Sequence, residues 1–346
     1  MKTFSHLHIK GFSECHVQGI AVDKKREYMY FSFTTSLIKT DLKGNLIGSV
    51  NGIVGHLGCI AYNFEDGKIY GSLEYKNDSI GKGILKAENC DITFDDAFYV
   101  VCFDADKITR PDMDAEKDGI MTAVWLKDVV DDFSCDGHRY GCSGIDGITF
   151  APKPGEKSGN FLYVAYGIYR DNKRRDNDHQ IILCYDTENL MKYSKSLNQY
   201  SLHNNGPQKA DNRYFVYTGN TSYGIQNLEY DKEHNCLFAA VYKGRKWRFP
   251  NYSMYAVDMS EKSEIKKLKG IKETGEWLSL KRLPFFKYKG KISGCNFPYG
   301  TTGMISLGDG KFLFSQEFRN EGGHGTDVYS YVLYPDKGFV RSEIHL

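Results

Sequence analysis

The strongest constraint on the fold is a short segment that recurs five times along the 346 residues. Each copy begins with a small residue, continues through two variable residues to Gly or Asn, and then enters an alternating apolar run. The aligned Gly or Asn positions are Gly19, Gly58, Gly147, Asn227 and Gly303. The first copy departs from the pattern, because His16 stands where the others have Gly. Repetition of this kind predicts one structural unit copied in series.

The residues after each copy also recur. A polar turn leads to a Tyr- or Phe-rich strand, and a third strand then ends near an aspartate. Short alternating strands separated by Gly, Asn and Asp turns are typical of antiparallel meanders. One such unit is too small to bury its faces without neighbours. We therefore predict an all-β fold, a single five-bladed β-propeller with four-stranded antiparallel blades.

The repeat also predicts where the blades lie within one domain of residues 1–346. The blades are expected at residues 12–54, 55–142, 143–222, 223–299, and 300–346 together with 1–11. The N-terminal TFSHLHIKG stands where other copies have an outer strand, so we expect it to close the ring beside the C-terminal strand. An open ring would leave two sheet edges exposed. The second range is long enough to contain a further irregular blade.

The recurring glycine has a physical explanation in this fold. Inner strands converge around a narrow axis, where a Cβ would crowd the adjacent blade. The pattern resembles five-bladed β-propellers, including apyrase-like nucleotidases and several glycosidase families, and the broader gluconolactonase-like and NHL-like propellers. The resemblance covers nearly the whole chain as a repeat pattern. It includes no family-specific catalytic motif, so it implies no catalytic residue.

Charge and cysteine content limit the classes of binding partner and the cellular compartment that are expected for this protein. Lys and Arg total 45 against 44 for Asp and Glu, so no net field attracts nucleic acid or an anionic membrane. The sequence has no apolar run of the length of a signal peptide or a membrane helix. Its nine cysteines are scattered and odd in number, which favours reduced thiols. We expect a cytoplasmic protein; the alternative is a secreted protein whose signal was removed.

The residues at the start of the inner strands should meet around one mouth of the channel. The position before each Gly or Asn holds Gln18, Leu57, Asp146, Gln226 or Thr302, and nearby positions add His16, His56 and Thr301. Convergent polar groups at a concave axis predict a ligand or metal site. The alternative is a water-filled channel whose side chains only satisfy strand ends.

A second layer of candidates comes from the ends of the second strands. Glu74 and Glu317 occupy similar places there, and a pair of carboxylates could act as acid and base, or as acid and nucleophile, on a glycosidic bond. We predict that Asp146 and His56 complete the catalytic set. The predicted substrate-binding residues are His16, Gln18, Tyr166, Arg170, Gln226, Tyr242, Lys243 and Thr302. Alternatively, the two glutamates pair with Lys243 or Arg170 in a solvated ion network.

Three places in the sequence contain residue types that bind metals. Calcium in the central channel, held by Asp146 and Asn227, is the favoured metal hypothesis. Residues 112–119 alternate acidic side chains before a glycine but lack the glutamate that ends a calcium loop, so a solvated loop is expected. Cys135, His138 and Cys142 are too few for a structural zinc site.

The sequence contains no G-x-S-x-G elbow, Walker loop, dinucleotide fingerprint or H-E-x-x-H motif. Serine hydrolase, P-loop and Rossmann chemistry are therefore disfavoured. The polar ring and the glutamate pair favour a hydrolase or lyase acting on a small polar substrate, preferably an oligosaccharide, with or without a metal. The alternative is a non-catalytic propeller that binds a glycan, peptide or protein partner. The low tryptophan count, 3, is unusual for a polysaccharide enzyme and supports that alternative.

Overall fold

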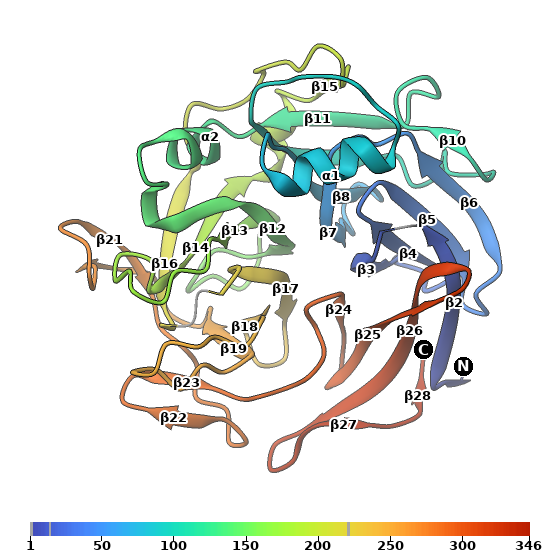
Figure 1. The fold of residues 1–346 in the computed structure, drawn as a ribbon. Helices are drawn as coiled ribbons and strands as arrows, with labels where there is room; N and C mark the ends of the chain where they lie inside the picture. Colours follow the sequence, from blue (N-terminus) through green and yellow to red (C-terminus); the bar gives the residue numbers. More distant parts are fainter. Residues whose placement is uncertain (1–2, 14, 220–221) are drawn as a thin grey trace.

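The computed structural model describes residues 3–13, 15–219 and 222–346. Five β-sheets radiate from a common axis, and the innermost strand of each sheet lies nearest the centre of the ring (Figure 1). This arrangement confirms the predicted all-β, five-bladed propeller.

The first three blades each contain four antiparallel strands in chain order from the axis outward. Blade 1 comprises β3 (Val17–Val22), β4 (Tyr28–Phe33), β5 (Ser36–Asp41) and β6 (Leu46–Asn51). Blade 2 comprises β7 (His56–Tyr62), β8 (Ile69–Tyr75), β9 (Ala97–Phe103) and β11 (Met121–Trp125). Blade 3 comprises β12 (Cys142–Ala151), β13 (Phe161–Ile168), β14 (His179–Asp186) and β16 (Asn212–Tyr217).

Blade 4 departs from the predicted four strands. Its sheet comprises β17 (Ile225–Asp231), β18 (Cys236–Val241) and β19 (Met254–Asp258). The expected outer strand forms a separate hairpin of β22 (Lys287–Lys289) and β23 (Ile292–Gly294), which reaches β19 through one bridge between Met254 and Cys295. The chain between β19 and this hairpin is diverted to blade 3, where β21 (Thr274–Leu278) pairs with β16 and carries β20 (Glu264–Lys267).

Two further short strands also pair with the preceding blade rather than with the blade in whose predicted range they lie. The strand β10 (Met113–Asp114) runs parallel to β6 of blade 1, and β15 (Lys195–Ser196) pairs with β11 of blade 2. Together with β21, these strands cover outer edges whose unpaired backbone groups would otherwise be exposed.

The ring closes between the two ends of the chain. Blade 5 comprises β24 (Met304–Gly308), β25 (Lys311–Asn320), β26 (Gly323–Tyr334) and the N-terminal β2 (His6–Ser13). The rest of the β26 edge that carries β2 pairs with β27 (Gly338–Arg341), while β1 (Thr3–Phe4) pairs with β28 (Ile344–His345). The first strand therefore lies beside the last blade, as the blue and red ribbons show in Figure 1.

The inner strands contact one another in the cyclic order β3, β7, β12, β17, β24 and back to β3. A Cβ added at Gly19 would lie 2.7 Å from the backbone nitrogen of Ile60 in the next blade. At Gly303 it would lie 2.8 Å from Cγ1 of Ile20. Both distances are too short for a side chain, so the predicted crowding is present.

The core is divided among the interfaces between blades. Five clusters of buried apolar side chains were found in the described part of the chain, and each joins two neighbouring blades. Every blade consequently depends on both neighbours to bury its faces. All nine cysteines are free, and five of them are buried in the sheets.

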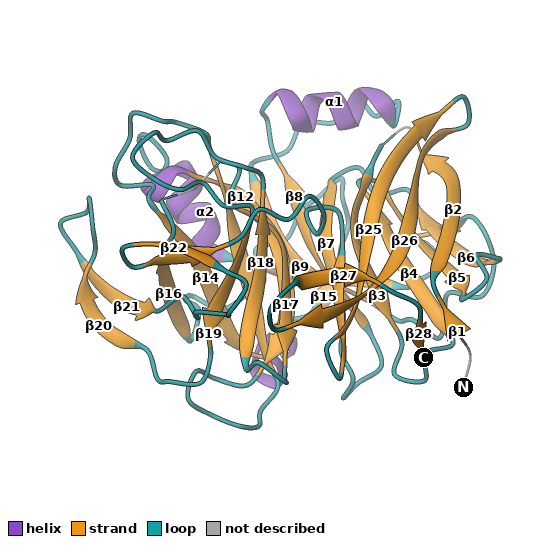
Figure 2. Ribbon diagram, turned by 90° about the horizontal axis from the view of Figure 1, so that it is seen from below, coloured by secondary structure: helices purple, strands orange, loops and turns teal. Residues whose placement is uncertain are grey.

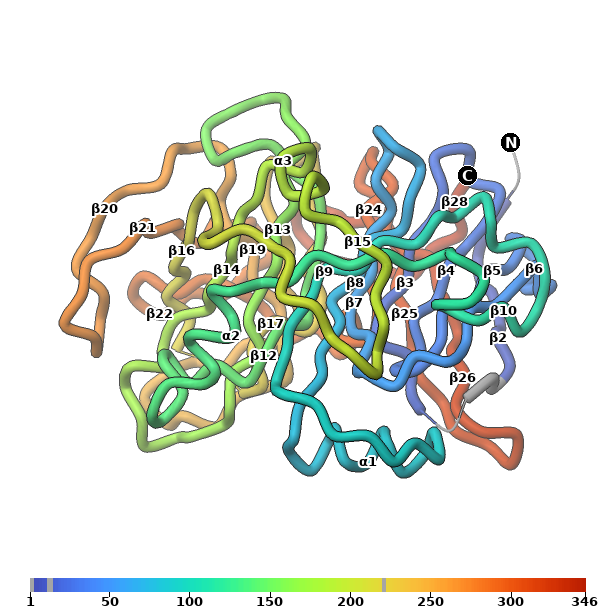
Figure 3. Tube along the Cα trace, turned by 90° about the horizontal axis from the view of Figure 1, so that it is seen from above, coloured from blue at the N-terminus to red at the C-terminus, as the bar shows by residue number. Residues whose placement is uncertain are grey.

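The long range 55–142 contains helices rather than a further blade. These are α1 (Ser79–Ala87), α2 (Lys127–Ser134) and the short 3-10 turn Arg139–Gly141, and α3 (Thr187–Met191) lies in blade 3. Helix α1 lies over one face of the ring (Figures 2 and 3). Among the residues described, no helix has the length and apolar character needed to cross a bilayer.

Candidate functional site

A cavity of about 640 Å³ lies on the ring face that α1 covers, and it collects many of the residues predicted from the repeat. Blades 1 to 4 and α1 contribute to its wall. The predicted residues that line it are His16, Gln18, His56, Glu74, Asp146, Gln226 and Tyr242. Three of the five residues that precede the recurring Gly or Asn, namely Gln18, Asp146 and Gln226, therefore meet at one mouth. This cavity is the candidate functional site.

The carboxylate of Glu74 is held deep in the wall. It lies at the end of β8, in register with His56, and its side chain is only 4% exposed. The backbone N–H of Ile145 donates to Oε1 of Glu74 at 2.5 Å. Gly144 permits this approach, because a Cβ built there would overlap Oε1, and its φ of +123° also disfavours other residues.

Lys76 is the principal residue that sequence reasoning missed. Its Nζ lies 2.7 Å from Oε2 of Glu74 and donates to the backbone oxygen of Ser143 at 3.0 Å. Burial alone would lower the pKa of Lys76, but Glu74 raises it above its ordinary value, so the ammonium stays charged. The spacing of Glu74 and Lys76, two residues apart at the end of a strand, was the available signal that both face the same side.

Asp146 occupies the blade 3 side of the cavity. Nε2 of Gln226 donates to Oδ2 of Asp146 at 3.1 Å, and the hydroxyl of Ser72 donates to its backbone oxygen at 2.8 Å. Desolvation, followed by the nearby Glu74 carboxylate, raises the pKa of Asp146 well above its ordinary value. The sequence therefore identified Asp146 correctly as a mouth residue, and the structure adds a neighbouring carboxylate on Glu74.

The two histidines of the mouth are neutral near pH 7. Burial lowers the pKa of His56 to about 3, and Lys76 and His16 contribute in the same direction. Burial also lowers the pKa of His16, although Glu317 opposes the shift. Nε2 of His16 accepts a hydrogen bond from Nε2 of Gln18 at 2.9 Å, whereas Nδ1 of His56 lies 3.6 Å from Oε2 of Glu74.

The low pKa of His56 predicts a pH-dependent stability. The folded pKa is about 3 and the ordinary value is 6.5, so the unfolded chain binds more protons between these values and stability falls as pH decreases below 6.5. His56→Gln should make the slope of unfolding free energy against pH shallower, by up to about 1.4 kcal/mol per pH unit. Urea unfolding between pH 7 and pH 4 measures both slopes. An unchanged slope in His56→Gln would contradict the account; the exposed His345→Gln is the matched control.

Six predicted residues lie outside the cavity wall, and four of them are Glu317, Thr302, Lys243 and Arg170. Glu317 accepts a hydrogen bond from Nδ1 of His324 at 2.5 Å, and the His324 ring centroid lies 6.1 Å from that of His16. Glu317 therefore does not line the cavity. The second carboxylate in the cavity beside Glu74 is that of Asp146, not the predicted Glu317. The hydroxyl of Thr302 bonds with that of Ser315 at 2.8 Å. Lys243 and Arg170 are exposed and do not line the cavity.

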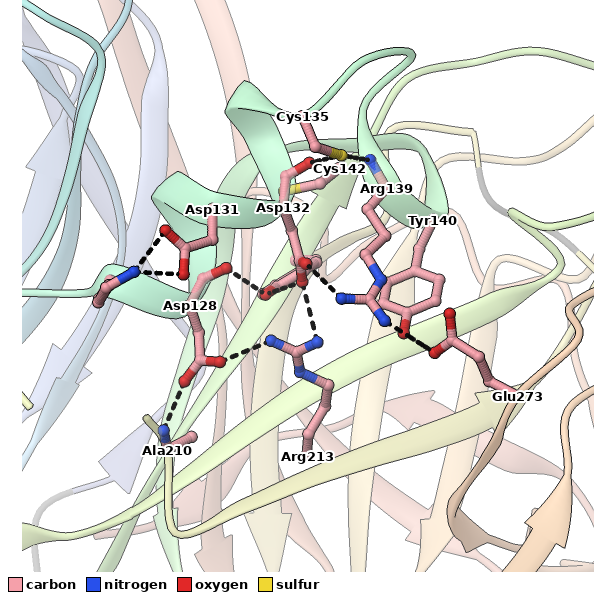
Figure 4. Close-up of polar contacts among 12 residues, drawn as sticks. Asp128, Asp131, Asp132, Cys135, Arg139, Tyr140, Cys142, Ala210, Arg213 and Glu273 are labelled. Carbon is pink, nitrogen blue, oxygen red and sulfur yellow. Dashed lines mark hydrogen bonds and ion pairs between the residues drawn. The ribbon is translucent and has the colours of Figure 1, made fainter. Parts of the chain in front are cut away.

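Tyr166 points away from the cavity into the packing between blades 2 and 3. Its hydroxyl donates to Oδ2 of Asp132 at 2.8 Å, within the ion network of α2 in which Arg213 bridges Asp128 and Asp132 (Figure 4). Tyr166 is inside strand β13, whereas Tyr242, another predicted substrate-binding residue, follows the end of β18. A small shift in alignment between strands moves a side chain to the opposite face. Tyr169 lines the cavity instead.

This placement predicts that Tyr166→Phe affects stability and leaves the cavity unchanged. The substitution removes a buried donor to Asp132, which should lower the free energy of unfolding by about 1–3 kcal/mol. Ligand affinity at the cavity should stay at the wild-type value. Denaturant unfolding and a binding titration measure the two effects. A large loss of affinity without loss of stability would show that Tyr166 belongs to the site after all.

The predicted calcium pair does not form a site. The amide of Asn227 lies on the axis, where Nδ2 donates to the backbone oxygens of Gln18 at 2.9 Å and Thr301 at 3.0 Å. Its Oδ1 faces the thiol of Cys59 at 3.2 Å. Calcium takes six to eight oxygen ligands. Asn227 uses its amide to join blades and does not line the cavity that contains Asp146, so the two residues do not fit a calcium site.

The mouth of the cavity is partly aromatic. The rings of Tyr223 and Tyr242, which are 50% and 40% exposed, meet edge to face with centroids 5.7 Å apart. Ile80 and Ile84 of α1 line the cavity from above. Sequence reasoning missed this helix, whose N-terminal cap, Asp78, accepts hydrogen bonds from the backbone of Ile80 and Gly81.

Comparisons with known proteins leave the function open. No protein-family model matches the chain, and no curated protein matches it. Among solved structures, the chain is similar to one described as "Structure of Dos1 propeller", with 11% sequence identity and a TM-score of 0.39. The similarity covers 96% of this chain and 70% of that chain.

Proposed function

We propose that this propeller is a hydrolase or lyase that acts on a small polar substrate in the α1-covered cavity, with an oligosaccharide as the favoured substrate. One observation carries the proposal. Two carboxyl groups, those of Glu74 and Asp146, line the same cavity in different electrostatic surroundings. Acid and base roles are assigned in enzymes by surroundings that separate the pKa values of two titratable groups.

The contacts support a division of labour between the two carboxyl groups. Burial raises the pKa of Glu74 above its ordinary value, while Lys76 and the backbone N–H of Ile145 oppose this shift and stabilise the carboxylate. Asp146 has no cation at hydrogen-bond distance among the described residues and accepts a hydrogen bond from the uncharged amide of Gln226. Burial and the nearby Glu74 carboxylate raise the pKa of Asp146, which favours its protonated form. In the proposed reaction Asp146 protonates the leaving oxygen, and Glu74 accepts a proton from water in a hydrolase or from substrate carbon in a lyase.

The remaining wall supports a polar, ring-shaped ligand. Cavities of about 300–1,000 Å³ are typical of small-molecule sites, and the volume of about 640 Å³ lies in that range. Nδ1 of His56 is buried without a hydrogen-bond partner among the described residues and lies 3.6 Å from Oε2 of Glu74. Tyr223 and Tyr242 offer apolar faces at the mouth, on which a sugar ring can pack.

The same features support a second candidate, a non-catalytic propeller that binds a glycan. The exposed tyrosines at the mouth favour it, because binding needs aromatic faces and polar contacts but no proton transfer.

The balanced charge of the chain supports a small-molecule ligand over nucleic acid or a membrane surface. The nine free cysteines support a reducing compartment such as the cytoplasm.

A substrate panel distinguishes the two candidates. Wild-type protein is incubated with oligosaccharides of neutral, amino and uronic acid sugars, and new reducing ends and unsaturated products are measured alongside binding by calorimetry. The proposal predicts turnover of at least one member, lost in Glu74→Gln and kept in Glu317→Gln, the matched control outside the cavity wall. Binding without turnover would support the second candidate. Equal turnover in wild type and Glu74→Gln would overturn the proposed chemistry.

A further inference from the structure

A second group of potential ligands lies away from the cavity, where the first strand closes the ring. His6 and His8 alternate along β2 and therefore project from the same face of the strand. The neighbouring strand β26 places Asp327 directly opposite His8 and Tyr329 opposite His6. Three side chains that commonly ligate metals are thus brought together by strand pairing between the two ends of the chain.

The geometry is close to that of a metal centre. Nε2 of His6 lies 2.9 Å from Oδ1 of Asp327, and Nδ1 of His8 lies 2.7 Å from the same oxygen. All three potential ligand atoms lie within 4.8 Å of one another. Among the described residues, this is the one place where three or more potential metal ligands lie so close together. We propose that His6, His8 and Asp327 bind a divalent transition-metal ion, with zinc as the best match to the donors.

The donor set supports zinc. Zinc sites with an open position use three protein ligands, including two imidazoles and one carboxylate, at about 2.0–2.2 Å. Tetrahedral ligands at that range are about 3.3 Å apart, so the two N–O distances here need to widen by only about 0.5 Å. The side chains of His6 and His8 are 41% and 49% exposed, so an ion can reach them. A water molecule would complete the coordination.

Neighbouring rings hold the imidazoles in position. The His6 ring stacks on Tyr329, with centroids 4.7 Å apart and an interplanar angle of 16°. The His8 ring stacks on Phe318, with centroids 4.8 Å apart and an angle of 7°. Rings fixed in this way lose less freedom when they bind a metal.

The position of the site indicates its role. A metal bound by β2 and β26 would join the N-terminal strand to the last blade and so strengthen the closure of the ring. Ligands that bind only the folded state stabilise it in proportion to the logarithm of their concentration. At about a hundredfold excess of zinc over Kd, the melting temperature should rise by about 3–5 °C.

The test uses the full chain with zinc chloride after treatment with a chelator. Calorimetry should show one zinc bound at this site, and cobalt substitution should give the visible absorption of a low-coordinate centre. His8→Gln and Asp327→Asn should each weaken zinc binding at least about tenfold and abolish the rise in melting temperature. The metal-free stability of His8→Gln should stay near wild type, because the His8 side chain is 49% exposed. His345→Gln, an exposed histidine on β28, is the matched control and should bind zinc like wild type.

Two results would overturn the proposal. The first is zinc affinity in the His6→Gln/His8→Gln double variant equal to that of wild type. The second is loss of binding in His56→Gln with normal binding in the double variant, which would place the metal in the cavity. Calcium chloride should leave the melting temperature unchanged, because calcium prefers a shell of oxygen ligands. The outcome is independent of the substrate panel, so failure here leaves the proposed reaction standing.

Discussion

Deletion of residues 1–10 is expected to remove a large part of the stability of the whole protein, about 4.5–9 kcal/mol. The estimate takes the loss of three buried apolar side chains, Phe4, Leu7 and Ile9, at about 1.5–3 kcal/mol each. Proteins of this kind are stable by only about 5–15 kcal/mol in total. The deletion also exposes the edge of β26. Since each blade buries its faces on both neighbours, the loss should affect the entire ring.

Thermal melting and urea unfolding of the full and shortened chains measure this effect. The shortened chain should unfold in one cooperative step at a much lower temperature, or aggregate through its exposed edge. Leu7→Ala should give an intermediate loss of about 2–5 kcal/mol, and the exposed Ser5→Ala should give none. A shortened chain with the wild-type melting temperature would show that β2 is dispensable and that the ring is closed by other contacts.

The second large effect is expected at the buried ion pair of the cavity. Lys76→Met leaves the Glu74 carboxylate 4% exposed and without its cation, which should lower the free energy of unfolding by about 3–5 kcal/mol at neutral pH. The penalty should shrink as pH falls, because protonation of Glu74 removes the unpaired charge. Unfolding titrations at several pH values measure both predictions.

Double substitution separates stability from function. A buried ion pair can often be replaced by uncharged groups without loss of stability, whereas removal of one partner is costly. Glu74→Gln/Lys76→Met should therefore recover most of the stability lost in Lys76→Met and still lack turnover. The exposed pair of Lys117 and Asp114, 3.0 Å apart, is the matched control, and Lys117→Met should show no measurable change. A double variant as unstable as Lys76→Met would mean that the pair holds the fold itself.

The repeat made most of the fold predictable, because glycine at the axis is a requirement of close approach. Gly19 and Gly303 lack space for a side chain, and the strands that carry them could be aligned from the sequence. The outer strands were harder to predict. Backbone pairing at an edge needs no particular residue, so β10, β15 and β21 could attach to the preceding blade without a signal in their own side chains.

The repeat also made part of the candidate site predictable. His16, His56, Asp146 and Gln226 were found because the inner strands begin in phase, and all four line the cavity. Helix α1 was missed because it belongs to an insertion after β8. Lys76 was missed although its spacing of two residues from Glu74 signalled that both face the same side. Tyr166 was predicted as a site residue but lies outside the cavity. The second strands were aligned by residue type, which does not tell which face of the sheet each side chain occupies.

The most direct test of the central claim is the turnover of Asp146→Asn on the substrate found by the panel. Asparagine keeps the hydrogen bond to Gln226 within reach but has no acidic proton to give to a leaving group. If Asp146 is the acid, kcat should decrease about 10²–10⁴-fold, with KM within about threefold of wild type and an unchanged melting temperature. A kcat within about twofold of wild type would contradict the account, because Asp146 would then not be the acid and the cavity would not work as proposed.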